Sequence, residues 1–375
     1  MTRAFVLKSR IVIALVAWAA LTLASAPAGA TGIRTDPLTI HARIGGSVYE
    51  LEAIVVRPDD GASHPLALLD HGSPRDARER PKQNPYGMWR QAAEFARRGW
   101  TAVPFMRRGY GKSEGAWAET YGGCGGPDYE AAGRAGAEDI AAAAKFMETE
   151  PYVAKGKWIS VGVSAGAYAT VALTAASPPG LAAALAFAPG RGSQGPNSVC
   201  AEGRLVAAFG RYGKTARTPL LWVSAPNDLF FGPALVARAL GAYRAGGGKA
   251  DFVAAPAYGS DGHFLFSQPG GIPIWTPIVD RFLESQGLQL RATPIELPRP
   301  NVAPPAGLDA RGRETFATYL ESGPNKAFAI GAGSRFGWAT GRRSVEEARA
   351  AALGFCAGIA STTCTVVNIN NRPSR

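Results

Sequence analysis

Short apolar segments alternate with helix-like segments over most of this 375-residue chain, and this alternation constrains the fold more than any other feature. The pattern favours a mainly parallel sheet covered by helices on both faces, an α/β fold. In such a sheet, loops that carry chemistry gather where the strands end. Three segments fall at such ends, namely HGSP at 71–74, GVSAG at 162–166 and PND at 226–228.

The segment ISVGVSAGAYAT at 159–170 contains a serine at the junction of an apolar strand and a helix. Gly162, Ser164 and Gly166 fit the pattern G-x-S-x-G, in which a strained turn exposes the serine hydroxyl above the sheet. The glycines leave room for neighbouring strand and helix backbones. We therefore predict that Ser164 is a nucleophile; the alternative is a plain structural turn.

A serine hydroxyl needs a base to accept its proton, and the chain contains four histidines. His263 follows the last strand in a glycine-rich loop and is the expected base, whereas His71 is expected to form structural hydrogen bonds. Asp228 directly follows a strand and is the expected acid that orients the imidazole. Asp261, two residues before His263, is the alternative; Asp228 could also be only a helix cap.

An oxyanion that forms during acyl transfer needs two hydrogen-bond donors. The backbone N–H of Ala165, next to the nucleophile, is the first candidate. The second is the N–H of Ser73, because the following Pro74 has none. The predicted order of nucleophile, acid and base along the chain is that of the α/β-hydrolase fold.

Taken together, HGSP, RRGYGKSEG at 107–115, GVSAG, PND and DGH at 261–263 resemble the α/β-hydrolase superfamily over residues 37–288. The resemblance is greatest to its serine-containing dienelactone-hydrolase-like and prolyl-oligopeptidase-like branch. True dienelactone hydrolases have a cysteine nucleophile, and this chain has Ser164. Because unpaired buried charges are rare, we expect one of Arg107 and Arg108 to form a structural ion pair, with Asp139 as a candidate partner; ligand binding is the alternative.

The first thirty residues have the features of a secretory signal peptide. A basic start precedes a short apolar run and a small-residue site, AGA, at 28–30. We therefore expect a protein exported to the periplasm or outside the cell; an N-terminal membrane anchor is the alternative. Export permits disulfides, and of three possible pairings we favour Cys124–Cys200 and Cys356–Cys364.

Domain boundaries follow from these patterns. We predict a signal peptide at 1–30, a catalytic domain at 31–290, a proline-rich linker at 291–310 and a small disulfide-containing α+β domain at 311–375. This last segment resembles small secreted domains of unknown function. Residues 190–216 are expected to be irregular and too short for a large helical lid, which leaves the site fairly open.

Aromatic residues in loops near the predicted site could line an apolar substrate pocket: Trp117, Tyr121, Phe230, Phe231, Phe264 and Phe266. The net charge of +11 comes from scattered basic residues, so no nucleic-acid partner is expected. No metal or organic cofactor is expected either.

We predict a serine hydrolase acting on a small-molecule ester through an acyl-enzyme. Three alternatives remain: a peptidase or amidase with the same residues, a non-catalytic binding protein, and a protein whose C-terminal domain has the main role by contacting the cell envelope or a polymer.

Overall fold

The computed structural model describes residue 1 and residues 32–298, 300–358 and 363–374. The predicted signal peptide at 1–30 therefore lies, Met1 aside, outside the described residues. No helix in the described ranges is long and apolar enough to cross a membrane.

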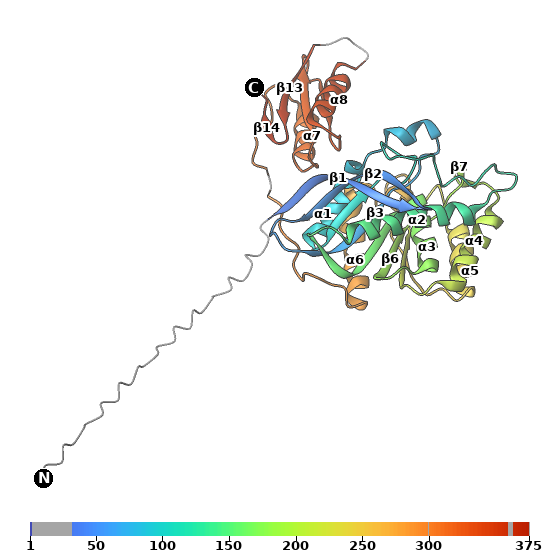
Figure 1. Ribbon diagram of the computed structural model, residues 1–375. Coiled ribbons are helices and arrows are strands. Elements are labelled where there is room, and N and C mark those ends of the chain that lie inside the picture. Colours follow the sequence, from blue (N-terminus) through green and yellow to red (C-terminus); the bar gives the residue numbers. More distant parts are fainter. Residues whose placement is uncertain (2–31, 299, 359–362, 375) are drawn as a thin grey trace.

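An eight-stranded sheet with the order β1-β2-β4-β3-β5-β6-β9-β10 forms the centre of the larger part of the protein (Figure 1). Strand β2 is antiparallel to both of its neighbours, and the pairs from β4 to β10 are parallel. This order is that of the predicted α/β-hydrolase fold. The strands are β1 Ile33–Ile44, β2 Ser47–Pro58, β3 His64–Asp70, β4 Thr101–Phe105, β5 Val153–Val163, β6 Leu181–Phe187, β9 Leu220–Ser224 and β10 Ala250–Ala254.

Helices cover both faces of this sheet, and each face has its own apolar core. One core includes Phe95 of α1 and Trp275 of α6. The opposite core includes side chains of α2 to α5, such as Tyr168 and Phe209. The six helices are α1 Trp89–Arg97, α2 Tyr129–Met147, α3 Ala165–Ala176, α4 Glu202–Thr215, α5 Pro233–Ala245 and α6 Ile272–Ser285.

The expectation of an irregular stretch at 190–216 was wrong. It contains the short strands β7 (Ser193–Gly195) and β8 (Ser198–Val199), followed by helix α4. Leu205, Phe209 and Tyr212 bury one face of α4 in the core shared with α3 and α5. Their spacing is helical, but three glycines in the same segment obscured it. Helix α4 therefore belongs to the layer that covers the sheet.

A second, four-stranded antiparallel sheet lies in the C-terminal part of the chain. It pairs β12-β11-β13-β14 and is accompanied by two helices, of which α7 was not predicted from the sequence. We call residues 310–358 and 363–374 the C-terminal module; Figure 1 shows it beside the β1–β2 end of the large sheet. Its elements are α7 Ala310–Leu320, β11 Ala327–Gly331, β12 Phe336–Ala339, α8 Val345–Ala357, β13 Cys364–Ile369 and β14 Arg372–Pro373.

Two disulfides are present, with the pairing that the sequence favoured. Cys356–Cys364 joins α8 to β13 within the C-terminal module, and Cys124–Cys200 joins two loops of the larger part. The small module has its own apolar cores, one of which includes Cys356. A covalent link helps to stabilise a unit of this size.

Candidate active site

Ser164 occupies the sharp turn between β5 and α3, with φ 56° and ψ −120°. Residues other than glycine rarely adopt a positive φ, so the backbone of this turn is strained. The flanking glycines are required by close backbone contacts. A Cβ at Gly162 would lie 2.5 Å from the Ala167 nitrogen, and one at Gly166 would lie 2.2 Å from the Asp70 carbonyl oxygen. The turn therefore has the geometry expected of a nucleophile elbow.

The imidazole of His263 contacts the carboxylate of Asp228. His263 Nδ1 lies 3.0 Å from Asp228 Oδ2 and 3.2 Å from Oδ1. Both side chains are buried, and the backbone N–H groups of Phe230 and Phe231 donate to the same carboxylate. Asp228 is not the cap of α5, which is Gly232. This arrangement fixes Nδ1 as the protonated nitrogen and leaves Nε2 as the basic one.

Asp261 is placed differently, although it lies two residues before His263. Its Oδ1 accepts hydrogen bonds from the backbone N–H groups of His263 and Leu229, at 3.0 Å each. The carboxylate therefore shapes the loop and does not contact the imidazole. Of the two acids considered from the sequence, the structure brings only Asp228 to the ring of His263.

Aromatic rings surround the imidazole of His263. The Phe230 ring stacks on it with 3.9 Å between ring centroids and 12° between planes, and Phe231 and Phe264 approach edge-on. The guanidinium of Arg75 in turn lies 3.5 Å from the centroid of the Phe230 ring. Among the described residues no hydrogen bond joins His263 to Ser164, but both line the same cavity. Such catalytic contacts often shorten only when substrate binds.

Two pockets meet at Ser164. The larger pocket, about 560 Å³, is mostly apolar and includes Ser164, His263, Phe230, Phe264 and Phe266 in its lining. The smaller pocket, about 70 Å³, is lined by Ser164, Ala165, Trp117, Tyr121, Phe230 and Phe231, together with Arg75, Arg80 and Arg191. The aromatic residues named from the sequence are therefore divided between two pockets instead of lining one.

Both candidate oxyanion donors lie beside Ser164. Ala165 is the first residue of α3, and Ser73 lines both pockets. The chain approaches the nucleophile closely here, because a Cβ added at Gly72 would lie 3.2 Å from Ser164 Cβ. The Ser73 hydroxyl accepts a 2.9 Å hydrogen bond from Tyr110. This bond holds the segment that follows β3 in place.

His71 is buried and bonded on both ring nitrogens, as expected of a structural residue. Its Nδ1 donates to the Gly72 carbonyl at 2.7 Å, and its Nε2 accepts from the Arg107 backbone N–H at 3.2 Å. Burial and the nearby Arg107 guanidinium hold the pKa of His71 well below its usual value. A neutral, doubly bonded imidazole is not available as a base for Ser164.

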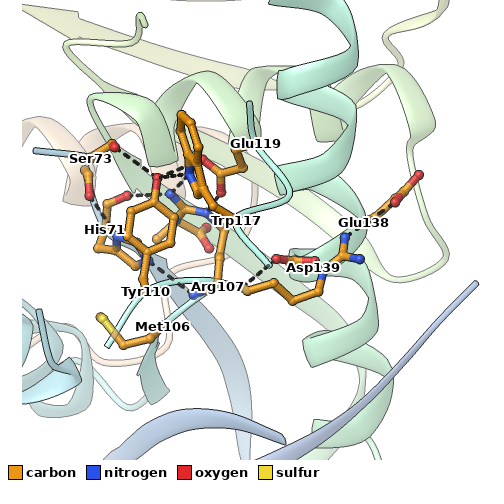
Figure 2. A network of polar contacts seen from close by, with 12 residues as sticks. His71, Ser73, Met106, Arg107, Tyr110, Trp117, Glu119, Glu138 and Asp139 are labelled. Atoms are coloured by element: carbon orange, nitrogen blue, oxygen red, sulfur yellow. Dashed lines mark hydrogen bonds and ion pairs between the residues drawn. The ribbon is translucent and has the colours of Figure 1, made fainter. Parts of the chain in front are cut away.

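Glu119 is the centre of a buried polar network that the sequence did not predict (Figure 2). It forms ion pairs with Arg107 and Arg191, and all three side chains are almost fully buried. Tyr110 also donates to it, at 3.3 Å. Burial alone would raise the pKa of Tyr110, but the guanidinium groups of Arg191 and Arg107 lower it overall. The network fixes the loop that carries Tyr110 and Trp117 against Ser73.

Replacing Glu119 with alanine is expected to lower the free energy of unfolding by about 3–5 kcal/mol, because two buried guanidinium groups would lose their carboxylate. Glu138 is the matched control, since its side chain is 61% exposed and lies 3.7 Å from Arg108. Glu138→Ala is expected to cost less than about 1 kcal/mol. Urea unfolding measures both; equal effects of the two variants would contradict this account.

Arg108 forms a further ion pair in this region. Its Nε lies 2.5 Å from Asp139 Oδ1, and its backbone N–H donates to Oδ2. The predicted structural ion pair with Asp139 is therefore confirmed, with Arg108 as the partner. Burial raises the pKa of Asp139 above its usual value, although Arg108 acts in the opposite direction.

Asp70 lies at the end of β3, beneath the elbow, and is fully buried. Its Oδ2 accepts from the Ser160 hydroxyl at 2.9 Å, while Oδ1 has no hydrogen-bond partner among the described residues. Burial raises the pKa of Asp70 from 3.8 to about 7, despite the opposing effects of Arg107 and of these hydrogen bonds. At pH values between 3.8 and about 7, Asp70 therefore keeps its proton in the folded protein and releases it in the unfolded chain.

The contribution of Asp70 to the free energy of unfolding is therefore fully present below about pH 4 and is lost as the pH rises through about 7. Asp70→Asn, which cannot ionise, is expected to show a smaller decline of the unfolding free energy between pH 5 and pH 8 than the wild type. Urea unfolding at several pH values measures this decline. Equal declines in the two proteins would contradict the expectation.

The sequence missed the polar residues that surround the site from distant parts of the chain. Glu119, Arg191, Gln83 and Gln91 are examples; the first two form the buried ion pair, and the last two line the larger pocket. None belongs to a motif. Glu119, Arg191 and Gln83 lie in loops and Gln91 lies in helix α1, and these positions do not identify partners.

Comparisons with known proteins give a family match and similar structures. The family model described as X-Pro dipeptidyl-peptidase (S15 family) matches residues 46–228. An esterase of Pyrococcus furiosus is 16% identical, with a TM-score of 0.47; the match covers 68% of this chain and 93% of that one.

Two further structures are similar to the same extent. A CIB-like hydrolase of Thermoplasma acidophilum is 17% identical with a TM-score of 0.45, covering 68% of this chain and 100% of that one. Acetyl xylan esterase 1 of a Thermoanaerobacterium species is 16% identical with a TM-score of 0.44, covering 68% and 88%. A search of curated proteins found no match.

The sheet order and the turn at Ser164 define the fold of the larger part of the protein. It is the α/β-hydrolase fold, and the family match over residues 46–228 agrees with it.

Proposed function

We propose that the protein hydrolyses carboxylic esters through an acyl-enzyme, with Ser164 as nucleophile, His263 as general base and acid, and Asp228 as the group that orients His263. The observation that carries this proposal is the combination of a strained Ser164 with an imidazole held by Asp228, both at one cavity. His263 Nε2 takes the proton of Ser164 as its oxygen attacks the ester carbonyl.

The tetrahedral intermediate places a negative charge on the former carbonyl oxygen. The backbone N–H groups of Ser73 and Ala165 are our candidates for stabilising it. Arg75, Arg80 and Arg191 line the small pocket next to Ser164, and no carboxylate of the described residues lines it, so the local field also favours an anion. His263 then gives its proton to the alcohol, and water attacks the acyl-enzyme by the reverse route.

Proton transfer to the alcohol places the leaving group near His263. His263 lines the larger pocket and not the smaller one. The alcohol part of the ester therefore belongs in the larger, apolar pocket, and the acid part extends toward the smaller one. We propose small and medium esters as the substrates, because such a pocket can bury their apolar surface.

A dipeptidyl-peptidase activity is the second candidate, because of the family match at residues 46–228. Such an enzyme must hold the ammonium group of a peptide N-terminus, for which a carboxylate is the suitable partner. Neither pocket has an aspartate or glutamate in its lining within the described parts of the chain, and three arginines lie at the smaller one. The charges therefore favour esters.

Turnover of matched substrates tests the two candidates. We expect the purified protein to hydrolyse p-nitrophenyl acetate and butyrate, and to leave Ala-Pro-p-nitroanilide and Gly-Pro-p-nitroanilide unchanged. The Ser164→Ala variant gives the background rate for each substrate. Faster turnover of the dipeptide anilides than of the esters would instead establish the peptidase.

We also propose that the protein is exported. The features of residues 1–30 support this, as do the two disulfides, since such bonds persist in oxidising compartments. We further propose that the C-terminal module contacts the cell envelope or a polymer and so targets the enzyme.

A further inference from the structure

One wall of the larger pocket is formed by a segment with little regular structure. Gln83, Asn84, Gly87 and Met88 all line this pocket, and only the short 3-10 turn Pro85–Met88 lies among them. The Gln83 side chain donates from Nε2 to the Gly72 carbonyl at 3.3 Å. Because Gly72 packs against Ser164, this wall lies next to the nucleophile.

The C-terminal module contacts the same wall. Arg343 Nη2 donates to the Gln83 carbonyl at 2.7 Å. Gly341 lies against the Tyr86 carbonyl, from which an added Cβ would be 3.2 Å away, and Gly323 packs on the Trp89 indole, where the distance would be 2.8 Å. The module therefore touches the segment 83–89 at several points.

Arg343 also forms a two-pronged ion pair with Glu52 of β2. Its Nε lies 2.5 Å from Oε1 and its Nη2 lies 3.0 Å from Oε2, and both side chains are less than one-fifth exposed. Paired hydrogen bonds between these two groups are stronger and more directional than a single surface contact. Glu52 thus fixes the guanidinium in the orientation that reaches Gln83.

Glu52 connects this contact to a second loop of the site. Its Oε2 accepts from the Lys112 backbone N–H at 2.9 Å, and Gly111 N–H donates to the Arg80 carbonyl at 3.0 Å. Gly111 has φ 58°, and an added Cβ would lie 2.7 Å from Glu52 Oε2. The same loop carries Tyr110, which contacts Ser73. One ion pair therefore joins the module, the pocket wall and the loop beside the candidate oxyanion donors.

We propose that the C-terminal module is a positioning element of the substrate site, and that Arg343 is the residue through which it fixes the 83–88 wall of the larger pocket. This inference rests on the proposed function for its substrate, because the wall faces the place assigned to the alcohol. Loss of Arg343 frees the Gln83 carbonyl and lets the wall move, so bulky alcohols bind less well while the chemistry at Ser164 is retained.

Kinetics of the full-length Arg343→Gln variant test this role. For phenyl acetate we expect KM to rise about tenfold, as for loss of a charge-assisted contact, with kcat within about twofold. For ethyl acetate, whose alcohol does not reach the wall, we expect little change in either constant. Arg343→Lys keeps the charge and one donor and should restore part of the loss. Arg342→Gln, at the adjacent position, is the control and should match the wild type for both esters.

Hydrogen exchange separates this role from general support of the fold. Faster exchange confined to residues 83–90 in Arg343→Gln, with an unchanged Tm, is the expected result. An unchanged KM for phenyl acetate, or unchanged exchange in this segment, would overturn the inference. A drop in Tm with equal loss for both esters would also overturn it, since that pattern indicates a structural role.

Failure of the proposed function gives a different pattern. If the wild type hydrolyses neither ester, the ester assignment is wrong, and the inference is then judged from hydrogen exchange and from labelling rates with a small and a bulky fluorophosphonate. If Arg343→Gln reacts more slowly than the wild type with the bulky reagent alone, the proposed role of Arg343 in fixing the 83–88 wall is supported. If the variant and the wild type react at equal rates with both reagents, this role is refuted.

Discussion

Ser164→Ala is expected to lower kcat for p-nitrophenyl butyrate by roughly four to six orders of magnitude, because the Ser164 oxygen is the proposed nucleophile that forms the acyl-enzyme. Stability should change little: alanine must adopt the same strained φ of 56°, and the serine hydroxyl is not needed to fill a core. Steady-state hydrolysis and thermal unfolding measure the two effects.

Ser285→Ala is the matched control for this experiment, since Ser285 ends helix α6 and its hydroxyl makes only local hydrogen bonds among the described residues, to the Phe282 carbonyl and from the Gln286 side chain. Its rate should equal that of the wild type. Retention of more than about one-hundredth of the activity in Ser164→Ala would show that another group attacks the ester.

Asp228→Asn is expected to reduce kcat by about four orders of magnitude while the fold is retained. The asparagine oxygen can still accept from the Phe230 and Phe231 N–H groups, which places the amide NH2 toward His263 Nδ1. The imidazole must then accept at Nδ1 and carry its proton on Nε2. In that tautomer it cannot accept the Ser164 proton.

Asp261→Asn provides the control in the neighbouring loop. Asp261 contacts two backbone N–H groups and not the imidazole, so activity should fall less than about tenfold, with a small loss of stability. Kinetics of the two variants at several pH values measure the difference. Equal losses would show that the base depends on Asp261 as much as on Asp228 and would contradict this assignment.

Sequence patterns could place the candidate residues Ser164, Asp228 and His263 at one edge of the sheet because the fold itself imposes these patterns. The strand before Ser164, the flanking glycines and the loops that end in Asp228 and His263 are local features, and parallel strands bring their ends to one edge. The order of the eight-stranded sheet agrees with this expectation. Ser164 and His263 line one pocket, and Asp228 contacts the ring.

Long-range polar contacts could not be predicted in the same way. Arg343 and Glu52 are separated by 291 positions, and Arg191 and Glu119 by 72, with no pattern linking them. Local signals failed where glycines interrupted the periodicity, as in α4, or where a helix followed a proline-rich stretch, as in α7. These elements are fixed by packing against neighbours more than by their own preferences.

Labelling by a fluorophosphonate, followed by intact mass, tests the central claim most directly. The reagent reacts with a serine only if a base activates its hydroxyl. We expect one adduct on the wild-type protein and none on Ser164→Ala or His263→Ala. An adduct that persists on Ser164→Ala, or a folded wild type that remains unlabelled, would contradict the assignment of Ser164 as the nucleophile.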